Sequence, residues 1–233
     1  MEVRKTKTGQ RRNKASGFSL IEMTMVVALI IIVSTISVMS LMPALQAQHL
    51  TNAYNTTLGV MRQARDNAVS QKTTYSLTFT VVASGGALVS KVTMAPTTTF
   101  SSDLPSTTYQ LPTDVAFATL LGLNSYPPPD GFGSASQPID FGYTTSGNSG
   151  GATAYTIYFC PDGSAQTTST CGGPSNWDNG VVYLNGPVTY SGSSATGYLQ
   201  NMRAITLWGG TGRIRGWRFY PNGAYTSYQW VRQ

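Results

Sequence analysis

The stretch Gly17-Phe18-Ser19-Leu20-Ile21-Glu22 marks a sharp change in the sequence, from a basic leader to an apolar run. The apolar run covers residues 18–42, and Glu22 is its only charged residue. As a helix, these 25 residues would be roughly 37 Å long, whereas the apolar core of a bilayer is about 30 Å thick. The sequence therefore predicts a helix that crosses a membrane.

The leader, residues 1–17, sets the orientation of this helix. It contains six Lys and Arg side chains and one acid, Glu2. By the positive-inside rule the leader stays in the cytoplasm, and the residues after the apolar run cross to the other side. A cleaved secretory signal has an apolar core of only about 7–15 residues. We therefore expect a single-pass membrane anchor with an extracytoplasmic head.

Glu22 is the anomaly of the apolar run. A carboxylate near the centre of a membrane helix costs on the order of 3 kcal/mol. Two interpretations remain open: the side chain reaches the nearby cytoplasmic surface, or it pairs with a cation that a neighbouring molecule supplies.

The basic leader followed by residues 17–33 resembles the processing site of type IV prepilins and pseudopilins. The resemblance implies cleavage after Gly17 by a prepilin peptidase of the inner membrane, and methylation of the new amino group on Phe18. It also implies storage in the inner membrane, followed by polymerisation with other pilins or pseudopilins through the N-terminal helix. Glu22 would then neutralise the Phe18 amine of a neighbouring subunit, so that each buried charge compensates the other.

The rest of the chain divides into a helix and a head. We expect a cleaved leader (residues 1–17), a helix (18–72, with 18–42 in the membrane or filament core and 43–72 amphipathic) and a globular β-rich head (73–233). Pro43 should kink the helix rather than end it. Apolar residues recur at helical spacing beyond it and should dock the helix onto the head. They are Leu50, Tyr54, Leu58, Met61, Ala64, Ala68 and Val69.

The head carries strand signals. Apolar and polar residues alternate from Tyr75 to Val81, which is typical of a half-buried strand. Further strands are expected around 87–94, 154–160, 181–184, 202–208, 213–220 and 224–231, with a Gly85-Gly86 turn after the first. Segments 95–113 and 122–151 are rich in Pro, Gly, Ser and Thr and indicate surface loops. The fold class is α+β, with the long N-terminal helix packed on an antiparallel sheet in the manner of a type IV pilin.

Cys160 and Cys171 are the only cysteines. In an extracytoplasmic head they are expected to form a disulfide. Two thiols and the single histidine, His49, argue against a metal site, and we predict no cofactor and no metal.

Catalysis is poorly supported by the residue types present. The only histidine, His49, lies on the helix just outside the membrane, which removes Ser-His-Asp, Cys-His and multi-histidine metal sites from consideration. Carboxylate-pair hydrolysis stays open by residue count, because the chain after the leader contains seven aspartates. Asp130, Asp162 and Asp178 lie beside glycines or in turn-like contexts, where short carboxylates cap the backbone. We therefore predict that the protein is not an enzyme.

The charge is unevenly distributed. The formal net charge of the chain is +6, but the chain without its leader has nine basic and eight acidic side chains. Residues 203–233 hold five arginines and no acid. The C-terminal end is therefore predicted to be a local basic patch.

Within this patch, Gly212-Arg213-Ile214-Arg215 combines a glycine turn with two arginines on one face of a strand. Side chains two residues apart lie about 7 Å apart, which suits successive phosphates of a nucleic-acid backbone. Ile214 should face the core. Arg203 and Arg218 are expected to extend the patch, with Arg232 as a further candidate and Trp217 or Tyr220 as a stacking face.

The Gly-Arg-x-Arg pattern is similar to that of FimT-type minor pilins, which bind DNA in natural transformation, and the segment 58–79 resembles the wider GspH/FimT group. By this resemblance Gly212 permits the turn, and Arg213 and Arg215 contact phosphates without reading base sequence. Alternatives stay open. H-type pseudopilins of type II secretion carry a similar ending as a structural hairpin, the arginines could be solvated or touch another subunit, and the Ser/Thr-rich loops could serve an adhesive pilin.

Overall fold

The structure is a computed structural model that describes residues 19–84, 87–97, 106–120, 122–133, 137–141, 152–191, 194–222 and 227–233. Gly17, Phe18 and the expected Gly85-Gly86 turn lie outside the described residues. The chain divides into two compact units, Met1–Pro43 and Ala44–Gln233. The second unit contains the second half of the helix together with the head.

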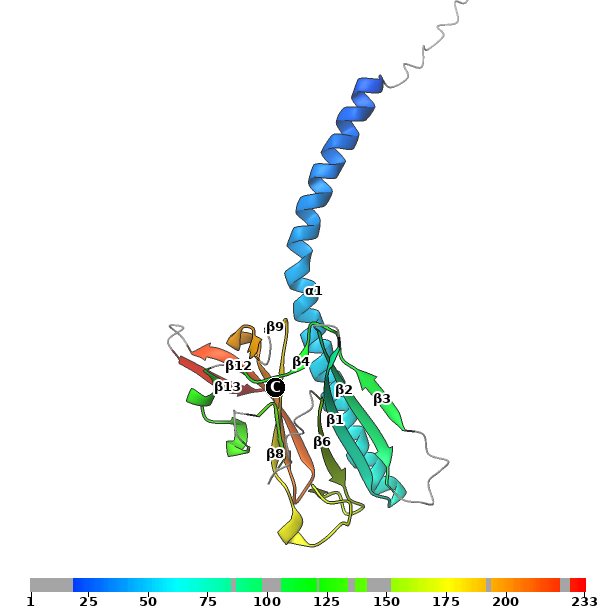
Figure 1. Ribbon diagram of the computed structural model, residues 1–233, viewed down its shortest axis with the longest axis vertical. Helices are drawn as coiled ribbons and strands as arrows, with labels where there is room; N and C mark the ends of the chain where they lie inside the picture. Colours follow the sequence, from blue (N-terminus) through cyan, green and yellow to red (C-terminus); the bar gives the residue numbers. More distant parts are fainter. Residues whose placement is uncertain are drawn as a thin grey trace, which may run out of the picture. The chain divides into compact units, whose positions relative to one another are not determined.

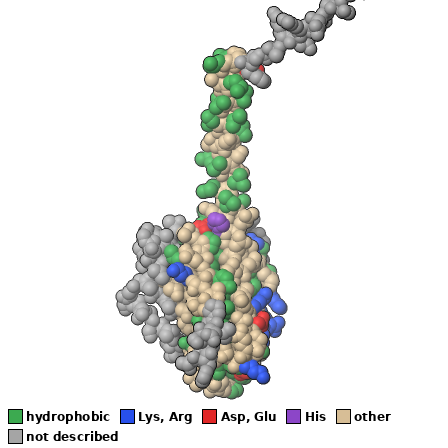
Figure 2. Space-filling model, turned by 90° about the vertical axis from the view of Figure 1, so that its right-hand side faces the viewer, with side chains coloured by type: hydrophobic (Ala, Val, Ile, Leu, Met, Phe, Trp, Pro, Cys, Tyr) green, Lys and Arg blue, Asp and Glu red, His purple; other side chains and the backbone are tan. Residues whose placement is uncertain are grey.

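Helix α1 (Leu20–Gln71) is 52 residues long and continues through Pro43 (Figure 1). The carbonyl of Ser19 accepts its first hydrogen bonds, from the amides of Glu22 and Met23 at 3.0 and 3.1 Å. In the first unit, the apolar side chains of α1 are exposed, Leu20 by 81% and Met39 by 76%, and Figure 2 shows them around the helix. The helix is long and apolar enough to cross a membrane.

In the second unit, one face of α1 is buried against the sheets. The buried residues recur at helical spacing, as the sequence predicts. They are Leu50, Ala53, Tyr54, Thr57, Val60, Met61, Ala64 and Ala68. Val69, which was expected in this stripe, is 42% exposed instead.

The first sheet has the strand order β3-β2-β1-β6-β7. Its strands are β1 (Tyr75–Ser84), β2 (Ala87–Pro96), β3 (Thr107–Gln110), β6 (Ala152–Phe159) and β7 (Ala165–Gln166). Every pair in it is antiparallel. Beside β7, a disulfide joins Cys160 to Cys171, as the sequence predicts.

The second sheet has the strand order β13-β12-β11-β8-β4, with β5 also paired to β8. Its strands are β4 (Ala116–Phe117), β5 (Ile139–Phe141), β8 (Gly180–Asn185), β11 (Arg203–Trp208), β12 (Arg213–Asn222) and β13 (Ser227–Arg232). A separate hairpin pairs β9 (Thr189–Ser191) with β10 (Ser194–Thr196). The α+β class, a long helix packed on antiparallel sheets, is confirmed.

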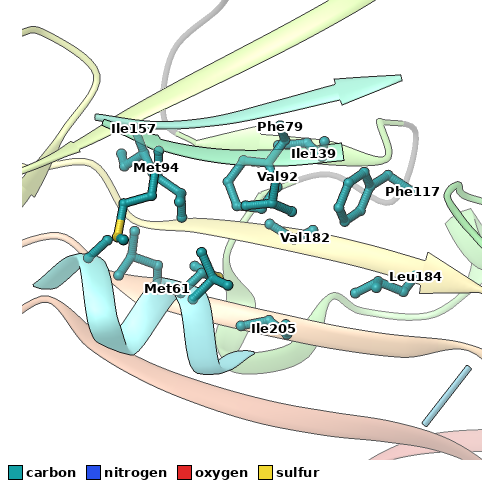
Figure 3. Packing of buried hydrophobic residues seen from close by; sticks show 14 of the residues in the cluster. Met61, Phe79, Val92, Met94, Phe117, Ile139, Ile157, Val182, Leu184 and Ile205 are labelled. Atoms are coloured by element: carbon teal, nitrogen blue, oxygen red, sulfur yellow. The ribbon is translucent and has the colours of Figure 1, made fainter. Parts of the chain in front are cut away.

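The main core lies where the two sheets and α1 meet. In Figure 3, Met61 of α1, Phe79 and Ile157 of the first sheet, and Val182 and Ile205 of the second point into one space. All five are fully buried. Because each such side chain contributes about 1.5–3 kcal/mol on burial, the three layers stabilise one another.

A second, smaller core covers the other face of the second sheet, and it corrects one expectation. The segment 122–133 was expected to be a surface loop, but Leu123 is 1% exposed and packs on this face. Tyr126 makes an edge-on contact with Phe219 of β12, with ring centroids 5.1 Å apart. Two short 3₁₀ turns, η1 (Leu123–Ser125) and η2 (Pro129–Gly131), shape this covering segment.

Candidate functional site

The turn between β11 and β12 requires a glycine at position 212. Gly212 has a φ of +57°, which residues with a side chain rarely adopt. A Cβ at this position would also overlap the carbonyl oxygen of Gly163 and the side chain of Arg65. The predicted role of Gly212 in permitting the turn therefore has a structural basis.

Arg65 of α1 holds this turn in place. Its Nε and Nη2 atoms donate hydrogen bonds to the carbonyl oxygen of Thr211 at 3.2 and 3.1 Å. A charged donor that bonds twice to one carbonyl gives strong and directional contacts. The helix and the hairpin are thus joined at the point where β12 begins.

Arg213 and Arg215 lie on the same face of β12, as the sequence predicts, because they are two residues apart in a strand. On β11 they are paired with Trp208 and Thr206. Ile214 is partly buried against the main core, also as predicted. Arg213 is exposed, whereas Arg215 is only partly so.

The guanidinium of Arg215 is already paired with an acid. Its Nη1 atom lies 2.8 Å from Oδ1 of Asp130, and the two side chains are 19% and 9% exposed. Thr206 donates its hydroxyl to Asp130 Oδ2 at 2.7 Å, and Trp217 donates Nε1–H to the Thr206 oxygen at 2.9 Å. Asp130 was expected to cap a turn, but it is the centre of this network.

Arg203 and Arg218 do not extend the patch, and this part of the prediction is wrong. They are cross-strand partners on the face opposite to Arg213, because the register alternates along β12. Arg203 is 7% exposed, and burial lowers its pKa to about 10, with a further lowering by the Arg218 charge. Arg218 lies over the ring of Tyr220, 4.4 Å from its centroid.

A pocket of about 560 Å³ opens beside the turn, and two arginines of α1 contribute to it. Its lining residues are Arg62, Arg65, Asp66, Trp208, Thr211, Gly212, Arg213 and Ile214. We call it the arginine pocket. Figure 2 shows Lys and Arg side chains gathered along one edge of the second unit, with an acidic side chain among them.

Sequence reasoning missed Arg62 and Arg65. Neither was expected to bind a ligand: Arg62 lies between the apolar residues of the helical stripe, and Arg65 lies within the segment 58–79. The available signal was their separation of three residues, which places two side chains on the same helix face. What the sequence could not reveal is that this face lies beside the start of β12.

The remaining predicted residues do not line the pocket. Asp162 caps its turn as expected, because its carboxylate accepts hydrogen bonds from the amide and the hydroxyl of Ser164. Asp178 likewise accepts hydrogen bonds from the amide and the hydroxyl of Thr167. His49 pairs with Asp114 at 2.9 Å. Among the described residues, no group of three His, Cys, Asp or Glu side chains is placed to hold a metal.

Glu22 lies in the first turn of α1. A carboxylate at this position interacts favourably with the positive end of the helix dipole. That interaction offsets part of the free-energy cost of placing the Glu22 carboxylate in an apolar run. The charge of Glu22 remains available to a partner.

Comparison with models of protein families, with curated proteins and with solved structures finds no match.

Proposed function

We propose that this protein is a subunit of a type IV pilin-like filament, held in the inner membrane by α1 before assembly. It is not an enzyme in this proposal. The observation that carries it is the apolar half of α1, whose membrane-length window has no residue buried inside the protein and whose single acid is Glu22 in the first turn. An exposed apolar helix of this length needs lipid or other helices around it.

The α+β head supports the same proposal. A long helix whose second half is packed on antiparallel sheets leaves its first half for the membrane and for contacts with other subunits. The motif at Gly17 and Phe18, which resembles a prepilin processing site, supplies the step that would release the subunit from its leader. Its partners are then the prepilin peptidase and other pilins or pseudopilins.

The processing step can be tested directly. We would express the full chain with a prepilin peptidase and determine the mature N-terminus by mass spectrometry. The proposal expects a chain that begins at methylated Phe18, with cleavage blocked in Gly17→Leu and normal in the control Ser16→Ala. A chain that keeps residue 1 in the presence of an active peptidase would overturn it.

We also propose that the head binds DNA, as part of uptake in natural transformation. Support comes from Arg213, which is exposed beside a turn that Gly212 and Arg65 fix in place. Arg215 contributes less than the motif suggests, because Asp130 already pairs with it.

One observation favours a second candidate, an H-type pseudopilin of type II secretion. The Arg215–Asp130 ion pair gives the Gly-Arg-x-Arg segment a structural role that needs no ligand. The neighbouring genes separate the two candidates, since pilus and competence components support the first and a secretion apparatus supports the second.

A further inference from the structure

The arginine pocket has a strong excess of positive charge. Three guanidinium groups line it, those of Arg62, Arg65 and Arg213, against one carboxylate, that of Asp66. Asp66 is 75% exposed and its Oδ1 lies 3.8 Å from Nη1 of Arg65, so solvent screens most of its effect. The site therefore favours an anion.

Two of these arginines are available to a ligand. Arg62 and Arg213 are exposed, and within the described ranges neither forms an ion pair. They belong to different elements, α1 and β12, and face the same pocket. A ligand that contacts both is therefore held by two positive charges that come from different elements.

The third arginine is held in place before any ligand arrives. Arg65 uses Nε and Nη2 on the Thr211 carbonyl, and this leaves the remaining Nη1 atom facing the acid on its own helix. Binding to a site whose parts are already fixed loses less conformational entropy. The same contact fixes the start of β12, and with it Arg213.

Trp208 supplies the pocket with an aromatic surface. This residue is 40% exposed, although Phe132 packs edge-on against its ring, at 5.1 Å between ring centroids. Arg215 lies over the ring at 5.7 Å. A ring that lines a basic pocket and stays partly open can stack with an unpaired base. In duplex DNA the bases are not available for this contact.

We infer that the arginine pocket binds the backbone of single-stranded nucleic acid, with Arg62 and Arg213 contacting successive phosphates, Arg65 holding the turn, and Trp208 stacking on a base. This inference rests on the DNA-binding part of the proposed function. The inference places the DNA-binding site at the junction between α1 and the β11–β12 hairpin, instead of on the face of β12 that carries Arg213 and Arg215. It also makes Arg215 a structural residue rather than a phosphate contact.

The test compares two variants of the full chain in detergent. Arg62→Gln/Arg213→Gln removes two charges from the pocket, and Lys72→Gln/Lys91→Gln removes two charges from residues that do not line it. The probe is a fluorescent 12-nucleotide oligo-dT, titrated at several salt concentrations. The leader also carries basic residues, but it is the same in all three proteins.

We expect Arg62→Gln/Arg213→Gln to bind the oligonucleotide about tenfold more weakly than wild type at low salt. The slope of log K against log salt should become shallower by about 1.4, because two phosphate contacts are lost. The control should stay within about twofold of wild type. Equal losses of affinity in the two variants would contradict the arginine pocket as the binding site. They would remain consistent with DNA binding through general positive charge. No binding by wild type would overturn both, without bearing on processing or filament assembly.

A cross-linking arm locates the contact independently of charge. An oligonucleotide with 5-iodouracil is irradiated with the wild-type protein, and tryptic peptides are analysed. We expect the adduct on peptide 204–213, in which Trp208 is the only tryptophan. Adducts confined to the leader would contradict the inference.

Competitors identify the ligand class. We expect unlabelled oligo-dT to displace the probe at far lower concentration than inorganic phosphate, double-stranded DNA of the same length or poly-glutamate. Displacement by phosphate at equal phosphate concentration would indicate a small-anion site. Displacement by poly-glutamate would indicate an acidic protein partner, and either result would overturn the inference.

Discussion

Arg215 of β12 and Asp130 of the η2 turn form an ion pair of 2.8 Å across 85 residues of sequence. Asp130 also accepts the hydroxyl of Thr206, which ties β11 into the same contact. The segment that covers the outer face of the second sheet is thus fixed to two of its strands. One arginine of the Gly-Arg-x-Arg motif therefore stabilises the fold.

Removing the acid of this pair should leave a mostly buried cation without a counter-charge. We expect Asp130→Asn to lower the free energy of unfolding by about 3 kcal/mol, measured by chemical denaturation of the full chain in detergent. The control is Asp66→Asn, whose exposed pair with Arg65 should contribute less than about 1 kcal/mol. Equal effects of the two substitutions would contradict a structural role for Asp130.

Alanine substitutions at two glycines should change the free energy of unfolding in opposite directions. A Cβ at Gly216 of β12 would overlap the hydroxyl of Tyr54 on α1, whereas a Cβ at Gly59 meets no atom within 4 Å. We expect Gly216→Ala to lower the free energy of unfolding by about 2 kcal/mol through overpacking. Gly59→Ala should raise it by about 0.5–1 kcal/mol through helix propensity. If alanine is tolerated at 216, α1 does not pack on β12 as described.

The turn at Asp162 should make stability depend on acid pH. Hydrogen bonds from Ser164, first from its hydroxyl and then from its amide, hold the pKa of this carboxyl below its usual 3.8. The folded state therefore favours the charged form, so the contribution is present above pH 3.8 and is lost as the pH falls through the lowered pKa.

In thermal unfolding across pH 2–6, we expect Asp162→Asn to lose less stability on acidification than wild type. Ser164→Ala should fall between the two, because it removes only the hydroxyl donor. Identical pH profiles for all three proteins would exclude this carboxyl as a source of the pH dependence.

The disulfide should stabilise the end of the first sheet. In the chain-entropy model, closing a loop with a sequence separation of 11 contributes about 2–3 kcal/mol. We expect Cys160→Ser/Cys171→Ser to lose about that much in chemical denaturation. Alkylation of the unreduced wild type should leave its mass unchanged, and a gain of two adducts would show that the thiols are free.

The sequence was most informative where a period repeats. Alternation along β12 placed Arg213 and Arg215 on one face and Ile214 on the other, and the helical stripe predicted which face of α1 is buried. Short strands such as β4, with two residues, are too brief for any period and were not predicted. Segment 122–133 was expected at the surface from its composition, although its few apolar residues are sufficient to cover a sheet.

The site itself depends on contacts between distant parts of the chain. The Arg65–Thr211 hydrogen bonds join residues 146 positions apart, and nothing in either segment indicates the other. The placement of Arg203 was mispredicted for a different reason. Charge alone does not give the face of a strand, and the register of β11 against β12 turns Arg203 and Arg218 away from Arg213.

The role of Glu22 in assembly provides the most direct test of the filament proposal. In cells that produce the filament, we would measure how much of the protein is present in sheared filaments for wild type, Glu22→Gln and the control Thr24→Val, which lies in the same turn of α1. We predict that Glu22→Gln is processed and retained in the membrane but is at least tenfold depleted from filaments, while Thr24→Val is incorporated normally. Incorporation of Glu22→Gln at the wild-type level would contradict assembly through a charge pair at this residue.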